Sequence, residues 1–145
     1  MKVKDVMSRD VQLTTPSEDI QAAARLMAEI DAGVLPVAEG DRLVGMITDR
    51  DIAVRAVAAG KSPDTPVAEI MSREVLYCFD DENVEKVSRN MADNKVRRMP
   101  VVNREKRLVG IISIGDLARS EKPTTTGKTV SEISTPGGQH SQSVH

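Results

Sequence analysis

The alternation of apolar and polar residues predicts a short series of helices and strands in the first part of the chain. Apolar residues recur at helical spacing over 20–30, the pattern of an amphipathic helix. Two aliphatic runs follow at about 34–38 and 42–47, joined by a Glu-Gly-Asp turn typical of a β-hairpin. A second helix is expected from about 48 to 60.

The same pattern returns in the second part of the chain. A helical stripe covers 84–91, aliphatic runs lie at about 99–102 and 107–112, and a helix is expected over 113–120. Short strands near 11–13 and 75–78 precede the first helix of each copy. The order in each copy is therefore β-α-β-β-α, and the predicted fold class is α+β, with helices against one face of a small sheet.

Short sequence motifs show that the two parts are copies of one unit. RLVGMIT at 42–48 matches RLVGIIS at 107–113, and VKDVMS at 3–8 matches VAEIMS at 67–72. The offset is 64 residues in the early motifs and 65 in the later ones, because the second hairpin turn is one residue longer. A regular duplication indicates two equivalent clefts, so the chain is expected to bind a ligand twice.

The length of each copy limits how the copies are organised. About 60 residues bury too little surface for comfortable stability alone, so we expect the copies to pack as one module with pseudo-two-fold symmetry. The predicted boundaries are 1–62 for the first repeat and 63–121 for the second, with a linker at 60–66. Residues 122–145 are rich in Ser, Thr, Gly and Pro and are expected to form a mobile tail.

Helix ends are marked by capping residues. Thr15-Pro16-Ser17-Glu18 predicts a capping box at the start of the first helix, and Gly33 a stop at its end. Asp80 and Asp81 are candidate caps for the first helix of the second copy.

Composition excludes several classes of partner and compartment. A formal charge of -2 argues against nucleic acid, because phosphate binding needs a basic face. The charged start and the lack of a long apolar stretch predict no signal peptide and no membrane span. The single cysteine, Cys78, cannot form an internal disulfide, so a cytoplasmic location is expected.

The candidate chemistry lies in a hydroxyl and an acid that recur at each junction between strand and helix. Thr48 precedes Asp51 by three residues, and Ser113 precedes Asp116 by three. One interpretation is a helix cap alone, because a hydroxyl with an acid at this spacing satisfies free backbone N–H groups. The other adds a ligand: the helix N-terminus attracts a phosphate and the carboxylate accepts hydrogen bonds from ribose hydroxyls.

The ordered, doubled motifs resemble a tandem CBS-domain pair, also called a Bateman module. Arg97-Arg98-Met99-Pro100-Val101 resembles the family's R-H-L-P-V pattern, and the resemblance covers about residues 1–120. It implies an adenosine-containing ligand such as AMP, ADP, ATP or NAD in clefts between the copies, with no cofactor required. It also implies a regulatory module that forms a homodimer and transmits occupancy to an unidentified effector protein.

The resemblance assigns site residues in each copy. In the first site, Thr48 and Asp51 would hold phosphate and ribose, and in the second, Ser113 and Asp116. The residues implied to line purine cavities or to lie near phosphates are Val34, Leu35, Pro36, Met99, Pro100, Arg50, Arg98 and Gly115. Asp49 precedes Arg50 in the first turn and would repel a polyphosphate, which favours a monophosphate or a dinucleotide there.

Two functions other than a nucleotide sensor are alternatives for a chain of this kind. The sequence lacks the residues expected of an enzyme. His140 and His145 lie in the predicted tail, and the sequence has no P-loop and no Cys/His metal cluster. No catalytic or metal-ligating residue is therefore predicted. A dimerisation scaffold without a ligand, in which the hydroxyl and acid only cap helices, is the stronger alternative.

Overall fold

The computed structural model describes residues 1–120 and Ile133, and these residues divide into two compact units. The central unit is Gln12–Val75, and the terminal unit combines Met1–Val11 with the chain from Leu76 onward. Both contain helices and antiparallel strands, as the α+β prediction requires. The predicted tail lies outside the described residues, except for Ile133, which is buried.

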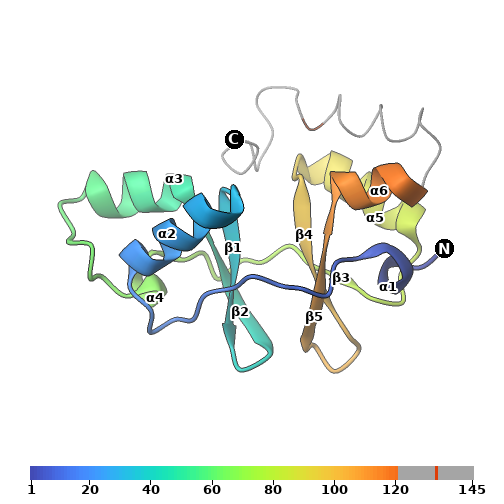
Figure 1. The fold of residues 1–145 in the computed structure, drawn as a ribbon, viewed down its shortest axis with the longest axis horizontal. Helices are drawn as coiled ribbons and strands as arrows, with labels where there is room; N and C mark the ends of the chain where they lie inside the picture. Colours follow the sequence, from blue (N-terminus) through green and yellow to red (C-terminus); the bar gives the residue numbers. More distant parts are fainter. Residues whose placement is uncertain (121–132, 134–145) are drawn as a thin grey trace. The chain divides into compact units, whose positions relative to one another are not determined.

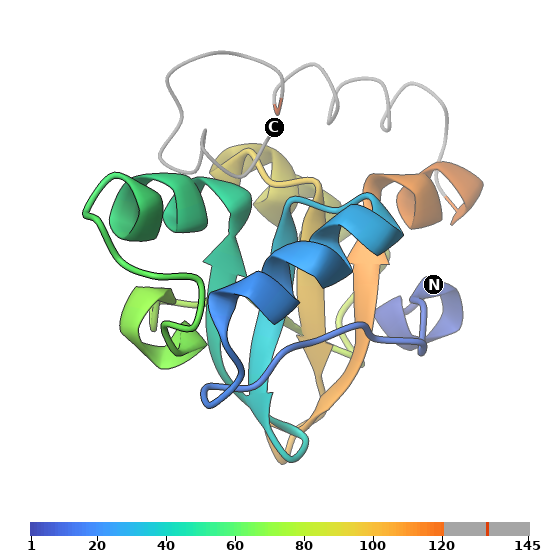
Figure 2. The same ribbon diagram turned by 60° about the vertical axis from the view of Figure 1, so that its left-hand side comes forward.

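The central unit is built on a β-hairpin. β1 (Val34–Glu39) pairs antiparallel with β2 (Arg42–Thr48), and α2 (Ile20–Ile30) lies across one face of the pair (Figure 2). β2 leads into α3 (Asp49–Asp51), which continues as the π-helix η1 (Ile52–Val57). The strand expected near 11–13 is only a parallel bridge between Thr14 and Val37.

The terminal unit has the same plan with a third strand. β4 (Arg98–Val102) pairs antiparallel with β5 (Leu108–Ser113), and β3 (Cys78–Phe79) runs parallel to β4 on its other side. α5 (Val84–Asn94) corresponds to α2, and α6 (Ile114–Ser120) follows β5 directly (Figure 1). Each unit thus contains one of the two predicted hairpins and two of the four predicted helices.

The segments that open the two copies each lie in the unit built by the other copy. α1 (Val3–Val6) packs in the terminal unit, where it contacts β5 and α6 (Figure 1). α4 (Val67–Ile70) packs in the central unit, where it contacts η1. The compact units therefore do not coincide with the sequence copies, although each unit still holds one example of every motif.

Backbone pairing holds each exchanged segment in place. In the terminal unit, the Ser8 N–H donates to the Ile111 carbonyl and the Ile111 N–H to the Ser8 carbonyl, both at 2.9 Å. In the central unit, the Met46 N–H donates to the Ser72 carbonyl at 2.9 Å and the Ser72 N–H to the Met46 carbonyl at 2.8 Å. The Met-Ser motif therefore extends the hairpin of its unit by an isolated bridge.

Two glycines are required where these segments cross the hairpins. A Cβ on Gly110 would lie 2.5 Å from the Met7 sulfur and 2.8 Å from the Ser8 carbonyl oxygen. A Cβ on Gly45 would lie 2.8 Å from both the Met71 sulfur and the Ser72 carbonyl oxygen. The glycine of the repeated motif thus makes room for a neighbouring chain segment rather than for a turn.

The predicted ends of the first helix are wrong. The N-cap of α2 is Asp19, whose Oδ1 accepts the Ala22 N–H at 2.7 Å. Residues 15–18 stay extended or turned because two of their carbonyls accept N–H groups of Val67 and Ala68 from the exchanged segment. The helix ends at Asp31, which takes the left-handed conformation with φ 53°, and not at Gly33.

The caps predicted for the second copy are also wrong. Asn83 caps α5, because its Oδ1 accepts the Glu85 N–H at 3.0 Å. Asp81 instead forms a bidentate ion pair with Arg104, at 2.8 and 2.7 Å, which holds the pKa of the Asp81 carboxyl below its usual value.

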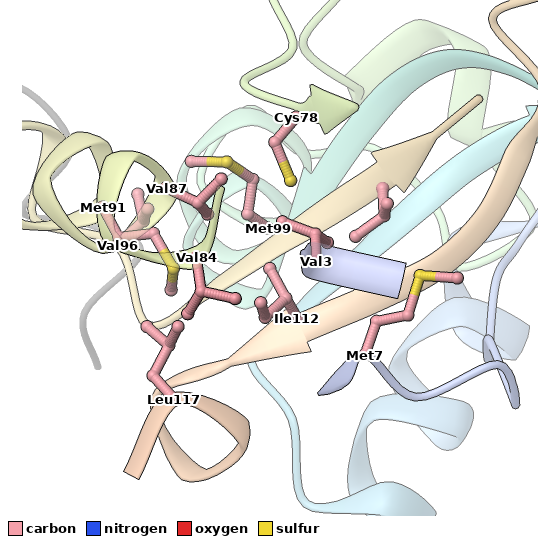
Figure 3. Packing of buried hydrophobic residues seen from close by; sticks show 11 residues of the cluster. Val3, Met7, Cys78, Val84, Val87, Met91, Val96, Met99, Ile112 and Leu117 are labelled. Carbon is pink, nitrogen blue, oxygen red and sulfur yellow. The ribbon is translucent and has the colours of Figure 1, made fainter. Parts of the chain in front are cut away.

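Each unit has its own aliphatic core. Figure 3 shows the terminal core, in which side chains from α1, α5 and the strands meet around Met99 and Ile112. The central core contains the corresponding side chains, and both include a methionine from the exchanged segment, Met7 or Met71. Flexible thioethers fill the space beside the two crossing glycines, as suits irregular gaps in a core.

Candidate functional site

Strand pairing brings the predicted site residues together at the end of each hairpin. Val34 at the start of β1 lies opposite Thr48 at the end of β2. Arg98 at the start of β4 lies opposite Ser113 at the end of β5. The hydroxyl that caps the following helix therefore has a β1 or β4 residue beside it in both units, which the linear spacing alone does not fix.

In the central unit, Thr48 and Asp51 cap one another. The Thr48 N–H donates to Asp51 Oδ2 at 2.9 Å, and the Asp51 N–H donates to Thr48 Oγ1 at 3.0 Å. The structure thus contains the cap that the sequence predicts. Asp51 Oδ1 has no hydrogen-bond partner among the residues that the structure describes, so this carboxylate keeps a free acceptor for another group.

In the terminal unit, Ser113 and Asp116 form the same cap with more contacts. Asp116 Oδ2 accepts the Ser113 N–H at 2.9 Å and the Ser113 hydroxyl at 3.1 Å. The Asp116 N–H donates to Ser113 Oγ at 3.2 Å. The other oxygen, Asp116 Oδ1, forms an ion pair with Arg119, so both oxygens of this buried carboxylate are occupied.

Arg119 lies at the candidate site, and the sequence did not predict it there. It lies three residues after Asp116 on α6, a spacing that places two side chains on the same helix face. That spacing was available in the sequence. It gave no sign of a role because an exposed arginine on a short helix is usually a solvated charge.

Cations lie near each junction but at different places. Arg50 and Arg98 are exposed, and neither side chain forms an ion pair or hydrogen bond within the described part of the chain. Arg50 lies inside the first turn. Its counterpart, Gly115, lies in an open position of the second turn, where a Cβ would meet only Ser113 Oγ at 3.5 Å.

Asp49 occupies the space beside Gly33. The Asp49 N–H donates to the Gly33 carbonyl at 2.9 Å, and a Cβ on Gly33 would lie 3.0 Å from Asp49 Oδ2. In the terminal unit, the corresponding bond runs from Ile114 to the Arg97 carbonyl at 3.0 Å. The central unit thus has Asp49 beside Gly33, where the terminal unit has Ile114 beside Arg97. This difference makes the central turn more negative.

Two residues expected to line purine cavities belong to the cores instead. Leu35 and Met99 are 0 % exposed and pack in the hydrophobic clusters of their units. Side chains alternate along a strand, so Leu35 and Met99 face the core and their neighbours the other way. Val34 is half-buried, and Pro36 and Pro100 are buried.

The one thiol in the chain is unsuited to nucleophilic chemistry. Cys78 is 1 % exposed, and its Sγ lies 3.8 Å from the Pro100 carbonyl oxygen. Burial, with smaller contributions from Glu82 and Asp80, raises the pKa of the Cys78 thiol to about 12, so it stays protonated.

The described residues also hold no group of three or more His, Cys, Asp or Glu side chains placed to bind a metal ion. None of the described helices has the length and apolar character needed to cross a membrane.

Comparison with known proteins gives the family. The CBS-domain family model matches residues 3–57 and 67–122. The chain belongs to the CBS-domain family. It is 41% identical over 133 residues to the CBS domain-containing protein YhcV of Bacillus subtilis, an alignment that covers 91% of this chain and 94% of YhcV.

Solved structures of CBS-domain proteins have the same fold. Hypoxic Response Protein I, solved with two coordinated zinc ions, has a TM-score of 0.74 at 36% identity, covering 84% of this chain and 100% of that protein. CBSX2, solved in complex with AMP, has a TM-score of 0.71 at 27% identity, covering 82% of this chain and 94% of that protein. The family and these neighbours identify the chain as a tandem CBS-domain pair and support a regulatory, nucleotide-sensing module.

Proposed function

We propose that this CBS pair binds adenine nucleotides, AMP-like or NAD-like, at the junction of strand and helix in each unit. The observation that carries the proposal is the central cap, in which Asp51 caps α3 with one carboxylate oxygen while the other has no partner among the described residues. A carboxylate in that state can accept hydrogen bonds from ribose hydroxyls without loss of the helix cap.

The charges around the central junction suit a ligand with few phosphates. The Arg50 guanidinium has no partner in the described part of the chain and is available to a phosphate, whereas the Asp49 carboxylate beside Gly33 would repel additional negative charge. A nucleoside monophosphate or a dinucleotide therefore fits this turn better than a triphosphate. In the terminal unit, Arg98 opposite Ser113 offers the cation.

The proposed role is regulatory and not catalytic. Bound nucleotide would favour one arrangement of the module, and an effector protein or the second subunit of a homodimer would read that change. The buried Cys78 thiol stays protonated and is unsuited to act as a nucleophile. We assign no catalytic residue. We place this activity in the cytoplasm, where adenine nucleotides are available and a free thiol persists.

Thermal unfolding with AMP, ADP, ATP, NAD or S-adenosylmethionine tests the proposal. A ligand at 100 times its Kd should stabilise the protein by ~2.7 kcal/mol. AMP or NAD should raise the Tm more than ATP does. If none of the five raises the Tm, the nucleotide proposal is wrong.

Asp51→Asn tests the residue that carries the proposal. The amide oxygen of asparagine can still accept the hydrogen bond from the Thr48 N–H. The NH₂ group, however, cannot accept a hydrogen bond from a ribose hydroxyl. We expect the affinity for AMP in the central unit to fall by about 1.5–3 kcal/mol, measured by isothermal titration calorimetry. Unchanged affinity would mean that Asp51 is a cap alone.

The second candidate function is a ligand-free dimerisation scaffold, and the terminal junction favours it. There both carboxylate oxygens of Asp116 are already engaged within the chain. The scaffold predicts a stable homodimer with the same Tm in the presence and absence of every nucleotide. Analytical ultracentrifugation beside the thermal series separates the two functions.

A further inference from the structure

The two acids that the repeat makes equivalent are in different states. Asp51 has one oxygen without a partner in the described residues, whereas Asp116 holds Ser113 with one oxygen and Arg119 with the other. The Asp116 side chain is 9% exposed and the Arg119 side chain 72%. The ion pair therefore joins a buried acid to a largely exposed arginine.

An arginine follows the acid in both units, but at different spacing. Arg119 is three residues after Asp116 on the α-helix α6, and Arg55 is four residues after Asp51. At the 65-residue offset of the repeat, Arg119 therefore corresponds to Val54, and Arg55 to Ser120. Arg55 lies in the π-helix η1, where the Ala58 N–H donates to the Ala53 carbonyl at 2.9 Å.

Arg55 has a different partner. Its Nη1 donates to the Met71 carbonyl at 3.4 Å, the only hydrogen bond of this side chain among the described residues. Met71 belongs to the exchanged segment that crosses the central hairpin. Arg55 thus binds that segment, and no hydrogen bond or ion pair joins it to Asp51 among the described residues.

We propose that Arg119 closes the nucleotide site of the terminal unit, so that the two sites bind with different affinity. This inference rests on the proposed function. A nucleotide reaches Asp51 directly, but its ribose must displace Arg119 before it reaches Asp116. The central site therefore fills first, and the terminal site responds only at higher nucleotide concentration.

Variants that keep the helix caps allow each nucleotide site to be titrated without the other. Asp51→Asn leaves the Asp116 site as the one site to titrate, and Asp116→Asn leaves the Asp51 site. Calorimetric titration with AMP should show tighter binding to the Asp116→Asn protein than to the Asp51→Asn protein. Circular dichroism melts establish that each variant is folded before its titration is interpreted.

Arg119→Ala then tests the arginine itself. In the Asp51→Asn protein it should tighten AMP binding about two- to fivefold, the range expected when a partly exposed ion pair no longer competes. In the Asp116→Asn protein it should have no effect, because its partner is gone. The matched control is Arg55→Ala, which should not change the Asp116 site because Arg55 contacts Met71 in the other unit.

Three results overturn the inference. Weaker AMP binding after Arg119→Ala would make Arg119 a ligand-binding residue, and unchanged binding would mean that it closes nothing. No AMP binding to the Asp51→Asn protein with or without Arg119 would mean that the terminal unit has no site. In all three cases AMP still binds at Asp51, whereas an unmodified protein that binds no nucleotide would overturn the proposed function itself.

Discussion

The central and terminal units contain the same cap at the same junction, and yet they present different chemistry. Thr48 with Asp51 and Ser113 with Asp116 form matching reciprocal hydrogen bonds. The difference comes from one residue beyond the motif, Arg119, which binds the acid of the terminal unit. A repeated motif thus determines the local backbone, while a neighbour outside it determines whether the side chain is available.

The units also differ at a buried position under the hairpin. Thr14 and Cys78 are equivalent, since each pairs parallel with the β1 or β4 residue Val37 or Val101. The Cys78 sulfur lies 3.8 Å from a carbonyl oxygen. Thr14 Oγ1 is buried without a hydrogen-bond partner in the described chain. Burial of an unpaired hydroxyl costs stability, so the terminal unit has the better residue at this position.

The largest expected effect concerns Gly45 and Gly110, where the exchanged segments cross the hairpins. Gly110→Ala would place a Cβ 2.5 Å from the Met7 sulfur and 2.8 Å from a backbone oxygen that cannot move cheaply. We expect the free energy of unfolding to fall by about 1–3 kcal/mol, measured by urea denaturation. Gly45→Ala should behave alike, because its Cβ would meet a backbone oxygen at the same 2.8 Å.

Gly115→Ala is the control for this prediction. Its Cβ would be in ordinary contact, 3.5 Å from Ser113 Oγ, within α6. Alanine should therefore leave stability unchanged or raise it by up to ~1 kcal/mol. Equal stability of all three alanine variants would show that the exchanged segments do not press on the hairpins.

A smaller effect is expected at Thr14. Thr14→Val removes the unpaired hydroxyl at nearly constant volume, so the free energy of unfolding should rise by ~1 kcal/mol. Thr65→Val is the matched control, because Thr65 is also buried but its hydroxyl donates to the Ser62 carbonyl at 2.7 Å. That variant should lose ~1 kcal/mol. Loss of stability in both variants would mean that Thr14 has a partner.

The smallest effect concerns the cation missing from the second turn. Gly115→Arg gives the terminal turn the charge that Arg50 gives the central turn, at a position with room for a side chain. In the Asp51→Asn protein, AMP binding should tighten about two- to fivefold at low salt and less at high salt. Gly115→Ala is the neutral control. An equal gain for alanine would assign the effect to the backbone rather than to charge.

Much of the fold could be predicted because the determining interactions are local. Both hairpins and the helices after them follow from alternating aliphatic runs and from a hydroxyl and acid three residues apart. The caps of α2 and α5 were mistaken because several polar residues compete within one turn. At α2, Asp19 became the cap once Pro16 and Glu18 were engaged by the exchanged segment.

The sequence by itself determined the duplication, the elements of each copy and the position of the hydroxyl and acid, since these depend on residues within a few positions of one another. Tertiary structure alone decided that each opening segment, with Met7 or Met71, packs on the hairpin of the other copy. It also placed Leu35 and Met99 in the cores and left Asp51 open while Asp116 is paired. Burial and pairing depend on neighbours that are distant in the sequence or that lie further along the helix, and the arginine that follows the acid has a different partner in each unit.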